Sequence, residues 1–247
     1  MIDSLLLTAA KICTFRQQEM LTNATSFFFE RDHRLFLVTS RHVLFDEPSQ
    51  HFPDRIEIEL HIDQANMAKS MQFSVLLYRD GAAIWRQGKD AAGAIDVAVI
   101  ELEWHSLPKS LVYRAFTPDQ LLKPDQHIEV GTPLLVVGFP LGFHDTLHHL
   151  PIVRQGVIAS SFGLRFEGRG YFLTDARTHR GTSGAPVVMR TTDPTGAQDL
   201  LPWRILGVHS SRLDIGSRDF NIDEALGLNC VWYPDILLTL TSATGSS

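Results

Sequence analysis

The sequence has few cysteines, no long apolar run and no surplus of basic residues. Its 2 cysteines, Cys13 and Cys230, exclude the multi-disulfide framework of small secreted domains and leave a single bridge between them open. The longest apolar stretches, such as Leu134 to Val137, are far too short for a transmembrane helix. With 22 basic and 28 acidic side chains, the net charge of −6 argues against a dedicated nucleic-acid binder.

The N-terminus lacks the basic start of a secretory signal peptide. A short apolar run between Met1 and Ala10 contains Asp3, and Lys11 follows the run instead of preceding it. A signal peptide has the opposite charge pattern. We therefore expect an intracellular (cytoplasmic) protein whose first residues belong to the fold.

Helical periodicity is almost absent, and short alternating or apolar runs recur along the whole chain. Ile56, Ile58 and Leu60 alternate with charged or polar residues, which is typical of a half-buried strand. The polar turn at 31–34 lies between two apolar runs and predicts a hairpin. Further strands are expected at 73–78, 97–102, 133–137, 157–160, 170–174, 186–189 and 205–208. The pattern predicts an all-β fold.

The strands fall into two units of comparable size. A segment rich in charge, with Pro118 and Pro124, interrupts the strand pattern near the middle. We expect a first β unit at 1–115, a linker at 116–130 and a second β unit at 131–232. Pro234 precedes an apolar run, so a short closing helix is expected at 233–241.

The run Gly181-Thr182-Ser183-Gly184-Ala185-Pro186 is the most informative stretch. Glycines around a serine allow a sharp turn, which can aim the N–H groups of Gly181 and Ser183 at one point. That arrangement suits the oxyanion of a tetrahedral intermediate. The alternative for this run alone is a glycine-rich loop with an incidental serine.

A nucleophilic serine needs a base, and the base needs a group that orients it. His42 follows a predicted strand end, and Asp96 begins an apolar strand. Taken singly, the histidine could be structural and the aspartate a cap. With the Ser183 motif they favour a catalytic triad at the seam, with His42 and Asp96 from the first unit and Ser183 from the second.

Further motifs make the chain resemble the chymotrypsin-like (trypsin-like) serine proteases, and within them the HtrA-type peptidase domains. These motifs are Thr174-Asp175-Ala176 ahead of Arg180-Gly181-Thr182-Ser183-Gly184, the loop Gly138 to Gly142, the strand Gln155 to Ala159, and Leu206-Gly207-Val208. The resemblance runs from about Thr25 to Leu240. It implies a single peptidase domain, with two six-stranded antiparallel β-barrels, the active site between them and a short C-terminal helix.

The resemblance also implies the roles of individual residues. His42 is expected to be the general base and then the general acid, Asp96 its orienting partner and Ser183 the nucleophile. The oxyanion loop is Gly181, Thr182 and Ser183. Ser210 and Ser211 are expected on the edge strand that pairs with an extended polypeptide substrate. No cofactor, metal or membrane partner is expected.

Two departures from the family pattern bear on regulation. Thr182 stands where digestive relatives carry the aspartate that pairs with a newly cleaved N-terminus, so activation by N-terminal cleavage is not expected. The segment after Val208 is too short for the PDZ domain of HtrA proteins, so regulation through such a domain is not expected either.

The first specificity pocket combines Arg177, Thr178 and His209. Arg177 falls where trypsin-type enzymes carry an aspartate, which disfavours a basic P1 residue. Thr178 and His209 match the threonine and histidine with which glutamyl endopeptidases and chymotrypsin-like viral cysteine proteases bind P1 Glu or Gln. We therefore expect cleavage after Glu, Gln or Asp, with charge assistance from Arg177. The alternative is a small apolar pocket, with Arg177 in solvent and His209 bonded internally.

Two other classes of function compete with a serine protease. A catalytically silent module of the same fold would bind a peptide or protein without turnover, although the complete triad favours an enzyme. A metal-dependent hydrolase would use the histidine-rich loop with His144, His148 and His149. Neither the spacing nor a nearby cysteine supports a zinc cage there, so a polar surface loop is the preferred interpretation.

Overall fold

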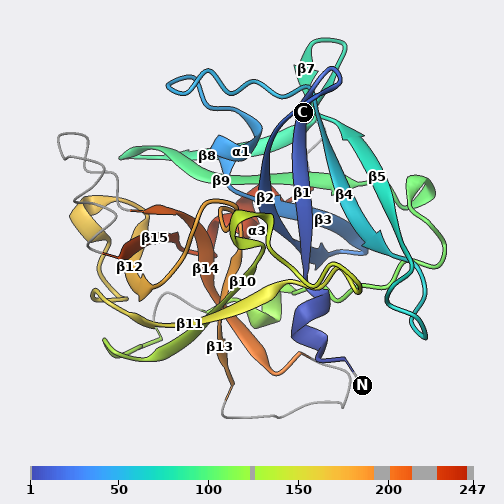
Figure 1. Cartoon of the computed structure of the whole chain (residues 1–247). Helices are drawn as coiled ribbons and strands as arrows, with labels where there is room; N and C mark the ends of the chain where they lie inside the picture. Colours follow the sequence, from blue (N-terminus) through green and yellow to red (C-terminus); the bar gives the residue numbers. More distant parts are fainter. Residues whose placement is uncertain (1, 123–125, 192–200, 213–226, 244–247) are drawn as a thin grey trace.

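The computed structural model describes residues 2–122, 126–191, 201–212 and 227–243. Its strands form two antiparallel units, which Figure 1 shows together with the chain ends. The first unit is a seven-stranded sheet in the order β5-β4-β1-β2-β3-β9-β8. Its strands are β1 (Ala9–Arg16), β2 (Glu19–Arg31), β3 (Arg34–Thr39), β4 (Arg55–His61), β5 (Ser70–Leu76), β8 (Trp85–Asp90) and β9 (Gly93–Leu102).

The second unit is a closed barrel in the order β10-β11-β12-β15-β14-β13. Its strands are β10 (Pro133–Gly138), β11 (Ile152–Ile158), β12 (Tyr171–Ala176), β13 (Pro186–Arg190), β14 (Trp203–Arg212) and β15 (Leu228–Trp232). The all-β class and the six-stranded second barrel are confirmed.

The helices of the described residues are one or two turns long. They are α1 (Arg41–Leu44), α3 (Ile236–Leu240), and the 3₁₀ turns η1 (Ser4–Leu7), η2 (Trp104–Ser106), η3 (Pro118–Gln120), η4 (Pro140–Gly142) and η5 (Phe166–Gly168). None of them has the length and apolarity to cross a membrane. The expected closing helix is present as α3.

The first unit is an open seven-stranded sheet, and a small hairpin lies between its two outer strands in the sequence. The two outer strands of the sheet, β5 and β8, are separated in sequence by a small hairpin of β6 (Tyr78–Arg79) and β7 (Ala82–Ala83). At the base of this hairpin the Ile84 N–H donates to the Leu77 carbonyl at 3.0 Å. A closed six-stranded barrel was expected for the first unit, and the structure has an open sheet of seven strands there, with β5 and β8 as its outer strands.

The predicted hairpin at 31–34 joins β2 to β3. Asp32 and His33 form its two-residue turn with φ values of 52° and 60°. Positive φ at both positions is the geometry whose twist matches the flanking strands. Asparagine, aspartate and histidine tolerate this region better than other residues with a side chain, so the polar turn has the composition that it needs.

Three successive phenylalanines in β2 divide between two cores. Phe28 packs inside the first unit with Leu35, Leu37 and other residues. Phe27 and Phe29 belong to a cluster that continues into the second unit, because alternate side chains of a strand face opposite sides. The two units are therefore joined by an apolar seam.

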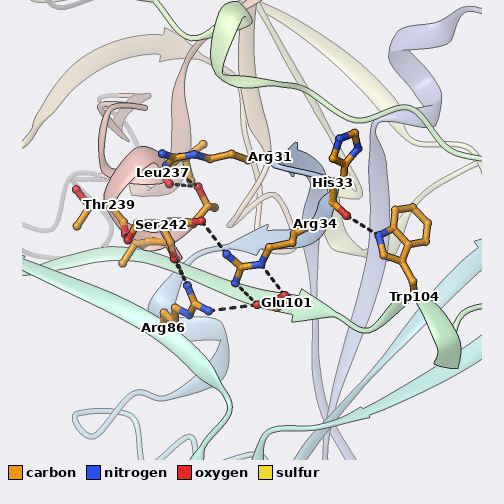
Figure 2. A network of polar contacts seen from close by, with 11 residues as sticks. Arg31, His33, Arg34, Arg86, Glu101, Trp104, Leu237, Thr239 and Ser242 are labelled. Carbon is orange, nitrogen blue, oxygen red and sulfur yellow. Dashed lines mark hydrogen bonds and ion pairs between the residues drawn. The ribbon is translucent and has the colours of Figure 1, made fainter. Parts of the chain in front are cut away.

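The C-terminal helix fastens the end of the second unit to the first. α3 follows β15 of the barrel but contacts β8 and β9 of the sheet. Figure 2 shows the polar network that holds it there: Arg31 donates to the Leu238 carbonyl at 2.6 Å, and Arg86 donates to the Ser242 carbonyl at 2.8 Å. Glu101 accepts from both Arg34 and Arg86, which fixes these guanidinium groups.

The two cysteines lie in different units and are free thiols. Cys13 is half-buried in β1, and Cys230 is buried in β15. Burial raises the pKa of Cys230 to about 12, so this thiol stays protonated at neutral pH and is a poor nucleophile. The bridge that the sequence left open is not formed.

Candidate active site

His42 lies on a single helical turn directly after β3. β3 ends at Thr39, Ser40 is extended, and α1 begins at Arg41. The His42 Nδ1 lies 2.7 Å from Asp96 Oδ2, and the His42 backbone N–H donates to Asp96 Oδ1 at 2.8 Å. One carboxylate therefore fixes both the backbone and the ring of the histidine, with Nδ1–H as donor and Nε2 left as the basic nitrogen.

Asp96 is aimed at His42 by an irregularity in the sheet. It lies near the start of β9, opposite the point where the pairing of β8 and β9 shifts register between Gln87 and Lys89. Such bulges bend a strand and redirect a side chain, and they are common beside active sites. The Ser210 hydroxyl donates a third hydrogen bond to this carboxylate, at Oδ2.

The ionisation of this pair follows from burial and mutual attraction. Burial disfavours both charged forms, and the side chains of His42 and Asp96 are only 33% and 19% exposed. The charge and hydrogen bond of Asp96 outweigh burial and raise the pKa of His42 above its ordinary value. The same contacts, with the Ser210 and His42 N–H bonds, lower the pKa of Asp96. The geometry thus supplies an ionised aspartate and a more basic imidazole.

Ser183 lies in a tight loop that is attached to both units. Its carbonyl accepts the Thr25 N–H at 3.0 Å from β2. The following Gly184 has φ of +86°, and a Cβ there would overlap the Thr25 carbonyl oxygen and Thr39 Oγ1. Only glycine lets the backbone approach this closely. The second glycine of the motif is thus required for the loop to dock against β2 and β3.

One carbonyl oxygen joins the segments of His42 and Ser183. The His209 carbonyl accepts the Gly184 N–H at 2.8 Å and the Ser40 hydroxyl at 3.1 Å. Gly184 follows Ser183, and Ser40 lies two residues before His42. The segment before His42 and the segment after Ser183 therefore meet at this carbonyl.

The Ser183 hydroxyl is partly exposed and makes no hydrogen bond to a described residue. It is therefore not bonded to His42 Nε2 in this resting geometry. In proteases without substrate the bond between nucleophile and base is often long, and it tightens when substrate binds.

The peptide between Arg180 and Gly181 is held in a defined orientation. Its carbonyl accepts the Leu141 N–H at 2.5 Å, so its own N–H points the opposite way, as in any trans peptide. Gly181 has φ of +90°, and a Cβ there would lie 2.5 Å from the Phe139 carbonyl oxygen. The N–H groups of Gly181 and Ser183 donate to no acceptor among the described residues. Thr182 between them is buried.

The predicted specificity residues differ in exposure. Arg177 is exposed, whereas Thr178 and His209 are 6% and 2% exposed. The Thr178 hydroxyl donates to Asn229 Oδ1 at 2.5 Å. The amide nitrogen of Asn229 donates to the Ala176 carbonyl at 2.8 Å, so its orientation is settled.

The sequence of this chain matches a known protein family. A model described as a trypsin-like peptidase domain matches residues 24–196. The chain belongs to the trypsin-like peptidase domain family. The matched range includes His42, Asp96 and Ser183. A comparison with curated proteins gave no match.

Solved structures of proteases share the fold of this peptidase domain. The serine endoprotease from Yersinia pestis is 13% identical with a TM-score of 0.55, over 95% of this chain and 61% of that chain. The Rv3671c protease from M. tuberculosis in its active form is 15% identical with a TM-score of 0.52, over 98% of this chain and 83% of that one. The chain thus spans about three fifths of the Yersinia structure.

Two residues of the peptidase domain's site, Thr25 and Asn229, escaped the sequence analysis, and Ser210 makes a contact that the sequence did not indicate. Thr25 holds the serine loop: its hydroxyl donates to the Gly181 carbonyl at 2.7 Å and accepts the Phe139 N–H at 3.0 Å. Asn229 orients Thr178. Ser210 was expected on the substrate-pairing strand, and in addition its hydroxyl donates to Asp96. The side chain of Ser211 lies outside the described residues. Polar residues inside apolar strands were the only available signal for the three.

Proposed function

We propose that the protein is a serine endopeptidase that hydrolyses polypeptides through Ser183, His42 and Asp96. The observation that supports this most strongly is the shared His209 carbonyl, which joins the residue after Ser183 to the residue that starts the turn with His42. A structural histidine would need neither this junction nor the hydrogen-bonded Asp96.

The proposed reaction follows from the ionisation of the pair. His42 Nε2 takes the Ser183 proton as the hydroxyl oxygen attacks the peptide carbonyl. Asp96 stabilises the imidazolium that results, and the N–H groups of Gly181 and Ser183 stabilise the oxyanion. His42 then gives its proton to the leaving amine. Water attacks the remaining acyl-enzyme with His42 again as base, which restores the Ser183 hydroxyl.

We further propose cleavage after Glu, Gln or Asp at P1. Thr178 and His209 are both buried, and a hydroxyl and an imidazole are groups that can hydrogen-bond a carboxylate or an amide. Arg177 is exposed, and its guanidinium can add charge assistance to a carboxylate.

A map of cut sites tests the proposed activity. The wild-type chain and Ser183→Ala are each incubated with a denatured protein mixture, and new peptide ends are identified by mass spectrometry. We expect internal cuts from the wild type alone. An identical peptide set from both proteins would contradict the proposal and favour a module that only binds peptides.

The pocket is tested with chromogenic peptides that differ only at P1. We expect kcat/KM for the Gln and Glu peptides to exceed that for the Leu peptide by about tenfold or more, with the Lys peptide slowest, because a site that hydrogen-bonds a substrate group discriminates against an analogue without that group. Thr178→Val should reduce the advantage of Gln over Leu and leave hydrolysis of the Leu peptide nearly unchanged. Faster cleavage after Leu, Val, Lys or Arg would contradict the pocket assignment.

The pH dependence follows from the raised pKa of His42. The base must be neutral to accept the proton, so kcat/KM falls as pH drops through the pKa of His42 in the free enzyme. We expect the midpoint of this acid limb to lie above 6.5, the ordinary value. The measurement is kcat/KM against pH in buffers of constant ionic strength, and a midpoint clearly below 6.5 would contradict the His42–Asp96 pairing.

A further inference from the structure

A histidine-rich loop of the second unit meets a glutamate of the first. The connection from β10 to β11 carries His144 and His149, and β4 carries Glu59. One potential ligand atom from each side chain lies within 4.8 Å of the other two. All three side chains are partly buried, so this is not a set of exposed charges that happen to be near each other.

His144 has the tautomer that a metal ligand needs. Its Nδ1 lies 2.6 Å from the Gly142 carbonyl oxygen. A carbonyl only accepts, so Nδ1 carries the hydrogen and Nε2 carries the lone pair. Metal-binding histidines are usually held in this way, with the second ring nitrogen bonded to a carbonyl or a carboxylate.

His149 and Glu59 meet without a proper hydrogen bond. The His149 Nδ1 lies 2.9 Å from Glu59 Oε1, with side chains 24% and 13% exposed. Yet this Nδ1 is buried and has no well-aligned hydrogen-bond partner. Glu59 Oε1 also accepts the Ser70 hydroxyl at 2.8 Å, the kind of support that orients a ligating carboxylate. A buried ring nitrogen and a carboxylate oxygen are thus close but poorly aligned for a hydrogen bond.

We propose that Glu59, His144 and His149 bind one divalent transition-metal ion of the Zn²⁺ class. Two imidazoles and a carboxylate match the preferences of Zn²⁺ and are unlike the all-oxygen sets that Mg²⁺ and Ca²⁺ require. Tetrahedral coordination at about 2.1 Å puts ligand atoms about 3.4 Å apart, so side-chain shifts of about 1 Å suffice. Water completes the fourth position.

The remaining histidines near this loop have other roles. His148 Nδ1 lies 2.7 Å from Asp145 Oδ2 within the loop. The His61 Nε2 lies 2.7 Å from the His148 carbonyl oxygen and, by the same reasoning, donates to it, which ties the loop to β4. His148 therefore offers a matched control: a histidine of the same loop outside the proposed ligand set.

The metal would fasten the loop that orients the oxyanion peptide. The loop begins at Leu141 and Gly142, where the Leu141 N–H holds the Arg180 carbonyl at 2.5 Å. A metal that links His144 and His149 to β4 restrains this segment against the first unit. That consequence for catalysis rests on the proposed function, whereas metal binding does not.

The experiment titrates Zn²⁺ into the full chain carrying Ser183→Ala, in competition with a chromogenic chelator. This background prevents self-cleavage, so the result does not depend on peptidase activity. We expect one Zn²⁺ per chain, at least about tenfold weaker binding in Glu59→Gln and in His144→Ala, and unchanged binding in His148→Ala and His42→Ala. Loss in His42→Ala with retention in His144→Ala would overturn the site and point to the triad imidazole as the ligand.

A second measurement needs no substitution at the ligands. Co²⁺ replaces Zn²⁺ in the Ser183→Ala chain, and its visible spectrum reports the geometry. We expect the intense absorption of tetrahedral Co²⁺, together with slower hydrogen exchange at the loop amides from Leu141 to His149 when Zn²⁺ is added. Only the weak absorption of octahedral Co²⁺, or unchanged exchange in this loop, would overturn the proposal.

Discussion

Replacing Ser183 by alanine is expected to lower kcat for peptide hydrolysis by about 10⁶-fold, the loss typical when a triad nucleophile is removed. Without the hydroxyl no acyl-enzyme forms, and His42 has no proton to accept from this position. The N–H groups of the loop remain, so residual catalysis by the oxyanion site is all that is left. The measurement is steady-state hydrolysis of the best chromogenic peptide.

The control for Ser183→Ala is peptide binding. The loop backbone makes the bonds to Thr25 and His209, and alanine keeps that backbone, so the variant should bind the peptide as tightly as the wild type. His42→Ala and the double variant should be no slower than Ser183→Ala by more than a small factor, because the residues act as a unit. Hydrolysis by Ser183→Ala at more than a tenth of the wild-type rate would contradict the assignment.

Replacing Asp96 by asparagine is expected to lower kcat by about 10⁴-fold. The amide cannot stabilise the imidazolium, and it favours the tautomer with the hydrogen on the wrong ring nitrogen. It also removes the charge that raises the pKa of His42, so burial is no longer outweighed. The acid limb of the remaining activity should therefore move to lower pH than in the wild type.

Ser210→Ala is the matched control for this prediction. It removes one hydrogen bond to the Asp96 carboxylate and leaves the charge and both His42 contacts in place. We expect a loss in kcat of at most about 100-fold, which corresponds to the loss of one hydrogen bond to a charged group and is much smaller than that of Asp96→Asn. An acid limb in Asp96→Asn at the same pH as in the wild type would contradict the role given to the carboxylate.

Local patterns were enough to predict most of the fold. The alternation at Ile56, Ile58 and Leu60 predicted β4, and the polar turn at Asp32 and His33 predicted the hairpin between β2 and β3. β1, β8 and β15 were not predicted; β8 in particular (Trp85–Asp90) is largely polar and lies at the outer end of the sheet. The order of the seven strands in the first sheet depends on pairing between segments distant in sequence, which no local pattern reveals.

The sequence analysis could select candidate site residues that lie in short motifs or at strand boundaries. Ser183 and its glycines are contiguous, and His42 and Asp96 each lie at a strand boundary. Thr25, Asn229 and Ser210 act through contacts across the fold, so their roles appear only with the tertiary structure. The proposed metal site could not be identified from the sequence for the same reason. The sequence indicated only the histidines His144, His148 and His149, whereas the structure groups two of them with Glu59 of a distant strand.

Labelling with a fluorophosphonate probe tests the central claim most directly, because only a serine activated by its base displaces fluoride rapidly. Folded wild-type protein should gain one adduct on the peptide that contains Ser183, and His42→Ala should gain it at least about a hundredfold more slowly. An unlabelled Ser183 in folded protein, or labelling that is indifferent to His42, would contradict the account.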